Sequence, residues 1–146
     1  MIKFEIVNPA DWMDSIQDLL QANWAETGFD FEFNPDIYLY QQLHKVGMMF
    51  AVAALDDDRL IGYCNVAMVR HLHNQDVLCA ANDALYVMPE YRKGLTAGRL
   101  ILAAEKEAKS RGATKFSWHC RSGTPFADML IKHGYEPADL VVVKGL

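Results

Sequence analysis

The chain has 146 residues, of which 51% are hydrophobic, and a formal net charge of −5 at pH 7. This length suffices for one buried core and is too short for two, so we expect residues 1–146 to form a single domain. The negative charge, with no basic run longer than Arg92-Lys93, argues against nucleic-acid binding, and the absence of eighteen consecutive apolar residues argues against a membrane span.

The three cysteines, Cys64, Cys79 and Cys120, are far apart and lie within apolar runs. Their odd number and spacing predict reduced thiols rather than disulfides or a metal set. The first residues lack the pattern of a signal peptide. We therefore expect a cytoplasmic protein without a bound metal, whose acidity favours amine-bearing partners.

One strand and two helices are predicted in the first third of the chain. Residues 3–7 alternate as a strand does, and Asn8-Pro9 is a helix start signal that predicts a helix ending near Asn23. The apolar face of this helix comprises Trp12, Ile16, Leu19 and Leu20. A second start signal is Asn34-Pro35, for a helix that Gly47 ends. Its apolar face comprises Leu39, Leu43 and Val46.

Aromatic and acidic residues alternate over residues 24–33, between these two helices, without a helical period. The aromatic residues are Trp24, Phe29, Phe31 and Phe33, and the acidic ones are Glu26, Asp30 and Glu32. Two interpretations remain open: an edge segment that folds its rings under the domain, or the wall of a substrate site.

Three strands are predicted next. Residues 48–55 and 60–69 are joined by Asp56-Asp57-Asp58-Arg59, a polar turn of hairpin length, and 77–87 is expected to be the central strand of the sheet. We interpret the three aspartates as a solvated turn. His71 and His73 are interpreted as surface residues, because no further metal ligand is near them in the sequence.

A helix, a strand, a helix and a strand complete the pattern. The apolar face of the first helix comprises Leu100, Ile101, Ala104 and Ala108, and this helix ends at Gly112. Residues 115–120 are strand-like, Thr124-Pro125 starts a helix that runs through His133, and 140–143 form a final β-branched run.

The connection from Pro89 to Arg99 joins a buried strand to a helix. Unpaired N–H groups and the positive dipole end at a helix start bind phosphate, and Arg92, Lys93 and Arg99 add positive charge. A lone Gly-x-x-x-Gly, here Gly94 to Gly98, also fits an ordinary solvated connection. The residues on either side of this pair favour the phosphate-binding interpretation.

These residues are Val87-x-Pro89-x-Tyr91-Arg92, followed by Ala97 and Leu100. The segment resembles the acetyl-CoA loop of the GNAT superfamily of N-acetyltransferases, Gln/Arg-x-x-Gly-x-Gly/Ala. Arg92 and Ala97 match this pattern, whereas Leu95 stands at the central glycine position. Lys132-x-Gly134-Tyr135 is similar to the closing Lys-x-Gly-Phe of that family.

The resemblance implies an α/β (α+β) fold: a mixed, mostly antiparallel sheet flanked by helices in the order β-α-α-β-β-β-α-β-α-β. It also implies an acyltransferase that passes the acetyl group of acetyl-CoA, its cosubstrate, directly to an amine. The pantetheine arm would lie as an added strand. The residues expected at the coenzyme are Leu85, Tyr86, Val87, Arg92, Lys93, Gly94, Leu95, Thr96, Ala97, Gly98 and Arg99.

Two residues are candidates for the catalytic base. Asp83 is expected on the same side of its strand as Leu85 and Val87, buried and with a raised pKa, although a polar residue at a sheet end is the alternative. His119 occupies the place of a glutamate in the similar Leu-Glu-x-Arg segment of N-terminal protein acetyltransferases, or is a hydrogen-bonded strand residue. Leu130 stands where many members carry a tyrosine acid, so that role is unassigned.

Two other functions stay open: a coenzyme A-binding module without catalysis, and an interaction domain that retains only the fold. Leu95 and Leu130 favour the first of these. The sequence leaves the amine undetermined among a polyamine, an aminoglycoside and a protein N-terminus, and it does not decide between a monomer and a homodimer.

Overall fold

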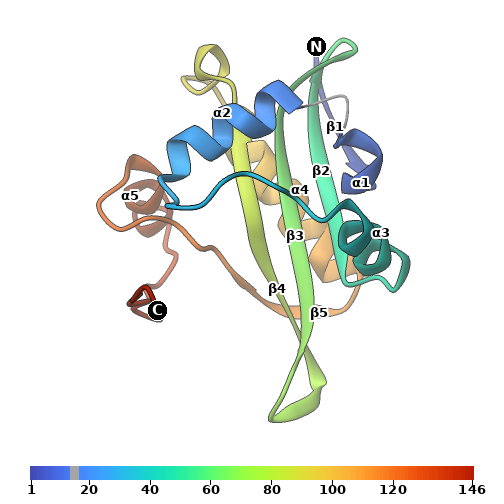
Figure 1. Cartoon of the computed structure of the whole chain (residues 1–146), viewed down its shortest axis with the longest axis vertical. Coiled ribbons are helices and arrows are strands. Elements are labelled where there is room, and N and C mark those ends of the chain that lie inside the picture. The colour runs from blue at the N-terminus through green and yellow to red at the C-terminus, as the bar shows by residue number, and fades with distance from the viewer. Residues whose placement is uncertain (14–16) are drawn as a thin grey trace.

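The computed structural model describes residues 1–13 and 17–146, and they form a five-stranded sheet in the order β1-β2-β3-β4-β5 (Figure 1). The strands are β1 Ile2–Val7, β2 Met49–Asp56, β3 Arg59–His71, β4 Asn74–Val87 and β5 Ala113–Ser117. All neighbours are antiparallel except β4 and β5, which are parallel. The mixed sheet is therefore confirmed, but its central strand is β3, and the expectation that residues 77–87 lie at the centre is wrong.

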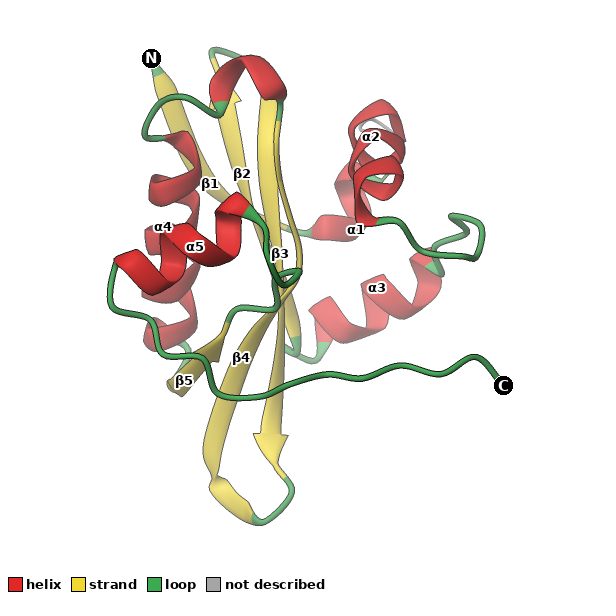
Figure 2. Cartoon of the chain, turned by 90° about the vertical axis from the view of Figure 1, so that its left-hand side faces the viewer, coloured by secondary structure: helices red, strands yellow, loops and turns green. Residues whose placement is uncertain are grey.

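Helices cover both faces of the sheet (Figure 2). They are α1 Pro9–Trp12, α2 Gln17–Thr27, α3 Ile37–Lys45, α4 Thr96–Ser110 and α5 Pro125–Lys132, with a 3-10 turn over Pro89–Tyr91. Two of the start signals act as predicted. The Asn8 side chain accepts a hydrogen bond from the Ala10 N–H, and Thr124 Oγ1 accepts one from the Ala127 N–H.

Two apolar cores result, one on each face. The core under α4 includes Phe50, Val52, Ile61, Val66, Leu100 and Ala104. The core under α1, α2 and α3 includes Met13, Leu20, Leu55, Tyr63 and Tyr86. The predicted inner face of α4 is confirmed, because all four of its apolar residues are buried. Successive residues of each strand point to opposite faces of the sheet, so the strands contribute apolar side chains to both cores, and both faces need helices to cover them.

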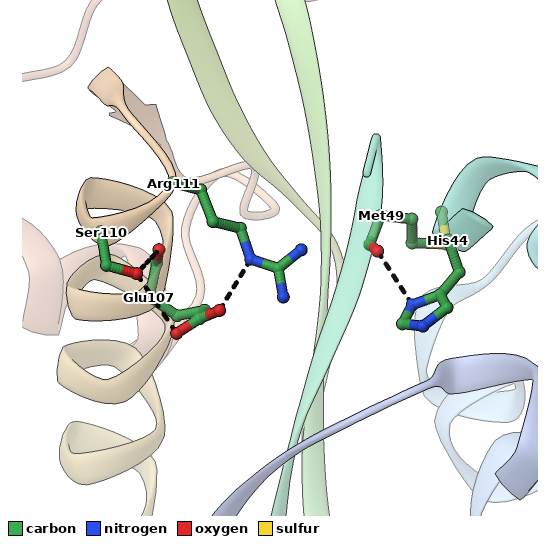
Figure 3. A network of polar contacts seen from close by, with 5 residues as sticks. All are labelled: His44, Met49, Glu107, Ser110 and Arg111. Atoms are coloured by element: carbon green, nitrogen blue, oxygen red, sulfur yellow. Dashed lines mark hydrogen bonds and ion pairs between the residues drawn. The ribbon is translucent and has the colours of Figure 1, made fainter. Parts of the chain in front are cut away.

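Arg111, at the end of α4, and His44, at the end of α3, approach β2 from opposite sides (Figure 3). Arg111, at the end of α4, donates from Nε to Glu107 Oε1 at 2.7 Å and places its guanidinium 4.6 Å from the centre of the Phe50 ring. On the opposite face, His44 Nδ1 lies 3.3 Å from the Met49 carbonyl oxygen. The end of α4 and the end of α3 are thus fixed to the same end of β2.

The two N-terminal helices differ from their predictions. The first helical region extends to Thr27 rather than ending near Asn23, and Ile16, assigned to its apolar face, lies outside the described residues. The second helix is capped by Asp36, whose Oδ1 accepts from the Leu39 N–H at 2.9 Å, rather than by Asn34.

The apolar face predicted for α3 is also wrong. Leu39 and Val46 are 49% and 64% exposed, whereas Ile37 and Tyr40 pack against the core under α1, α2 and α3. The face of α3 that carries Ile37 and Tyr40 is the one that packs toward the sheet.

The C-terminal part of the chain contains less strand than predicted. β5 ends at Ser117 rather than Cys120, and residues 140–143 form no strand, with side chains between 79% and 90% exposed. A β-branched run becomes a strand only where a neighbour supplies hydrogen bonds and packing, and the described ladder does not extend to it. Among the described helices, none combines the length and apolar character needed to cross a bilayer.

Candidate active site

One edge of β4 is open along half of its length. On one side β4 pairs with β3 as far as Val87, opposite Gly62. On the other side its ladder with β5 covers only Leu78 to Ala81. Within the described residues, the segment 82–87 therefore has a strand neighbour on one side only, and an extended ligand has backbone groups to pair with on the other.

Asn82 marks the point where the sheet splits. Its Nδ2 donates to the His119 carbonyl oxygen at 3.1 Å, and its Oδ1 accepts from the His119 N–H at 2.6 Å. The Asn82 side chain is 7% exposed, so these bonds are largely shielded from water. The Asn82 amide thus replaces the backbone pairing of β4 with β5 where β5 ends. It also brings Asp83 and His119, the two candidate bases, near each other. His119 itself is exposed and lies beyond β5.

Asp83 is the extra residue of a β-bulge. Asn65 lies opposite Ala84 and Val66 opposite Asn82, so Asp83 has no partner on β3. Its Oδ2 accepts a hydrogen bond from Tyr40 Oη at 3.3 Å, on the α3 face of the sheet.

The bulge corrects two expectations about Asp83. Leu85 and Val87 pack into the core under α4, so Asp83 does not share their side of the strand. Asp83 is also exposed, and the burial that was expected to act on its carboxyl is absent.

The sequence analysis missed three residues on the same face of the sheet as Asp83, namely Tyr40, which bonds to the carboxylate, and Tyr63 and Asn23, which bond to each other. Asn23 Nδ2, from α2, donates to Tyr63 Oη at 2.8 Å. Burial, and then the charge of Asp83, raise the pKa of Tyr40 far above its usual value. Burial likewise raises the pKa of Tyr63, although the hydrogen bond from Asn23 opposes this in part. Both hydroxyls therefore keep their protons at neutral pH. The inward positions of Ile37 and Tyr40, three residues apart, were the only sequence signal for this cluster.

The start of α4 exposes backbone donors. The Arg99 N–H bonds to the Leu95 carbonyl at 2.9 Å, so the N–H groups of residues 96–98 precede the first helical hydrogen bond. A Cβ added at Gly94 or Gly98 would meet no atom within 4 Å. The Leu95 side chain is 73% exposed. A hollow of about 350 Å³ adjoins the helix start, with Gly94 and Arg99 in its wall.

Arg92 bonds to β4 and α2, not to the start of α4. Its Nε donates to the Val87 carbonyl at 2.7 Å, its Nη2 lies 2.7 Å from Glu26 Oε1 on α2, and its guanidinium sits 5.3 Å from the centre of the Tyr86 ring. Arg92 precedes α4 in the chain, as the loop assignment requires, but its charge is already paired with Glu26. Lys93 and Arg99 are exposed and form no ion pair within the described residues.

The missing acid is not replaced by the closing tyrosine. Leu130 is buried, and Tyr135 Oη donates to Glu105 Oε1 at 2.7 Å. Burial and this hydrogen bond raise the pKa of Tyr135 to about 12. Trp118 Nε1 donates to the same carboxylate oxygen at 2.9 Å, so Tyr135 joins the end of the chain to α4.

An open strand edge that leads to the free N–H groups of a helix suits an extended ligand with a phosphate at one end, and a carboxylate beside that edge suits proton removal. The fold and the site are those of a group-transfer enzyme. The chain belongs to the acetyltransferase (GNAT) family, whose profile matches residues 14–135, and it is an acyltransferase. A search of curated protein sequences finds no match.

Solved structures share the fold. An aminoglycoside acetyltransferase from an uncultured soil metagenomic sample has a TM-score of 0.81 at 14% identity, with 100% of this chain and 99% of that chain covered. A predicted acetyltransferase with acetyl-CoA from Clostridium acetobutylicum has a TM-score of 0.77 at 14% identity, covering 99% and 96%. Ribosomal-protein-alanine N-acetyltransferase from Brucella melitensis biovar Abortus 2308 has a TM-score of 0.73 at 16% identity, covering 100% and 99%.

Proposed function

We propose that the protein transfers the acetyl group of acetyl-CoA to a primary amine by direct attack. The observation that carries this proposal is the position of Asp83, which lies at the start of the open edge of β4. The far end of this edge leads through the loop to the free N–H groups of α4. The coenzyme, the amine and the base then lie along the same edge of β4.

The coenzyme lies along the open edge, with its phosphates at residues 96–98 and the side chains of Lys93 and Arg99. Because Arg92 occupies the Val87 carbonyl, the pantetheine arm pairs with the other backbone groups of residues 82–87. Replacing both Lys93 and Arg99 by alanine is expected to weaken acetyl-CoA binding and to reduce its salt dependence. Lys144→Ala, in the exposed tail, is the matched control. Equal affinity of the double variant and the wild type, measured by calorimetry at physiological salt, would exclude this phosphate site.

The chemistry requires a neutral amine. Asp83 removes the ammonium proton, the nitrogen attacks the thioester carbonyl, and an N–H group of β4 stabilises the oxyanion. The C–S bond then breaks, giving an amide and the coenzyme thiolate, and the second proton that the nitrogen loses passes to the thiolate or to water. A thiol with a pKa near 8.5 leaves readily as thiolate, so catalysis does not depend on a tyrosine at position 130. The Tyr40 hydroxyl holds the Asp83 carboxylate in place.

Free-thiol release from acetyl-CoA in the presence of an amine panel tests the reaction. Asp83→Asn is expected to lower kcat/KM by about 10²–10⁴-fold, the usual effect of removing a positioned base, while acetyl-CoA affinity stays near normal. His119→Ala is expected to cost about tenfold or less on the same scale. If instead the acidic limb of the pH–rate profile disappears only in the histidine variant, the two roles must be exchanged.

A coenzyme A-binding module without turnover is the second candidate, which the buried Leu130 at the usual acid position favours. Acetyl-CoA binding without thiol release on a broad panel would support it. The amine classes to include follow the similar structures, an aminoglycoside and an N-terminal alanine of a ribosomal protein. We place the reaction in the cytoplasm, because all three cysteines are free.

A further inference from the structure

Charge is divided unevenly along the chain. Residues 1–44 hold eight of the 19 carboxylates and only one of the 14 lysine and arginine residues. The remaining residues hold eleven carboxylates and thirteen basic side chains. The acidic part supplies α1, α2 and α3, which cover the same sheet face as Asp83, whereas the start of α4 belongs to the basic part. A cationic acceptor and an anionic coenzyme are therefore attracted to different parts of the surface.

An aromatic surface, comprising Trp24, Phe29, Phe31 and Phe33, lies at the end of α2 within this acidic part. The Trp24 ring stacks on Phe29 at 4.7 Å and lies 5.3 Å from Phe31 and 5.5 Å from Phe33. Phe33 packs against the core under α1, α2 and α3, which fixes the inner end. Phe29 and Phe31 are 49% and 60% exposed. One ring of this segment therefore folds under the domain, as the first interpretation expects, and two rings face solvent.

A cation already rests on this surface. The Arg121 guanidinium carbon lies 5.2 Å from the centre of the Phe29 ring, within the range of a cation–π contact. Arg121 is exposed and forms no ion pair with a carboxylate in the described part of the chain. A cation from solution that took its place would therefore break no salt bridge.

This place lies close to Asp83. His119 is bonded through its backbone to Asn82, the residue before Asp83. Arg121 follows His119 by two residues, so their Cα atoms are at most about 7 Å apart. The side chain of Arg121 thus extends from the split in the sheet to the aromatic surface. An acceptor whose amine is at Asp83 reaches Phe29 with a second charge over a similar span.

We infer that the aromatic surface at Phe29 is a binding subsite for a second cationic group of the acceptor, which Arg121 occupies in the free protein. The acceptor is therefore a molecule with two or more positive charges separated by a short apolar spacer. One ammonium loses its proton to Asp83, and the other displaces Arg121 and stays charged on the Phe29 ring. This inference rests on the proposed acetyl transfer and specifies its substrate class.

The test compares α,ω-diamines, from propane-1,3-diamine to octane-1,8-diamine, with monoamines of the same length in the thiol-release assay. The best diamine is expected to have a KM about fivefold below that of its monoamine, the size of one exposed cation–π contact. Phe29→Leu, which keeps apolar bulk but removes the π face, should abolish this difference with little effect on kcat. Arg121→Gln should lower the KM of the diamine and leave that of the monoamine unchanged.

Two controls separate this effect from general ones. Tyr38→Leu removes a 70% exposed aromatic ring of α3 outside the surface, and Lys132→Gln removes one charge from α5 without touching Phe29. Neither should change the diamine advantage. Equal KM values for diamine and monoamine at every length, or an equal change of both in Phe29→Leu, would overturn the subsite.

Calorimetry with octane-1,8-diamine and pentane-1,5-diamine, in the absence of acetyl-CoA, distinguishes failure of the subsite from failure of the proposed reaction. Binding that Phe29→Leu weakens about fivefold supports the subsite even if no amine is acetylated. If neither diamine binds and amines are nevertheless acetylated, the reaction stands and the subsite does not exist.

Discussion

Asn82→Ala removes the amide that ends the ladder between β4 and β5. Two hydrogen bonds to the His119 backbone are lost, of 2.6 and 3.1 Å. Each such bond contributes about 0.5–1.5 kcal/mol net, so the free energy of unfolding is expected to fall by about 1–3 kcal/mol. The Asn82 side chain is almost fully buried, but His119 is exposed and its backbone groups regain water, which favours a value of about 2 kcal/mol.

Urea unfolding followed by circular dichroism measures this loss by linear extrapolation. Asn74→Ala is the matched control, because Asn74 begins the same strand and accepts only an exposed hydrogen bond from the Asp76 N–H. It should cost about 0.5 kcal/mol or less. Acetyl-CoA affinity should fall in Asn82→Ala alone, since the edge of the split is no longer held. A cost as small as that of Asn74→Ala would refute the assignment of Asn82 as the residue that ends the ladder.

Three further predictions concern residues of the candidate active site and of the strands beside it. A Cβ at Gly62 would lie 2.8 Å from the Tyr86 carbonyl oxygen, so Gly62→Ala should destabilise the protein by about 1–3 kcal/mol. An unchanged midpoint of urea unfolding would contradict the close approach of β3 and β4. The folded-state pKa of Tyr40 is raised, so its contribution to stability is complete below about pH 10 and is lost as the pH rises further. The free energy of unfolding of Tyr40→Phe should therefore fall less steeply at alkaline pH than that of the wild type, and an identical pH dependence would disprove this. Glu26→Gln frees the charge of Arg92 and should tighten acetyl-CoA binding severalfold at low salt, with a stability cost of about 1 kcal/mol or less because the pair is half exposed; weaker binding in calorimetry would count against it.

Local sequence signals alone determined many of the helices and turns. The inner face of α4 follows from its 3.6-residue period. The first residues of α1 and α5 follow from the N-caps Asn8 and Thr124 with the prolines after them. The hairpin at residues 56–59 and the connection from β4 to α4 were likewise predicted from local residues. These features depend on neighbours within about one helical turn or one hairpin, so the order of residues carries the information.

Only the tertiary structure decided which side chains meet around the open edge of β4. Tyr40 bonds to Asp83 across 43 positions, Asn82 to His119 across 37, and Arg92 to Glu26 across 66. A bulge reverses the face on which Asp83 lies, although alternation along β4 predicts the opposite face. Residues 140–143 show the same limit, because β-branched side chains favour a strand but cannot supply its partner. Strand pairing, register and helix rotation are set by contacts between distant segments, and no local pattern in the sequence encodes them.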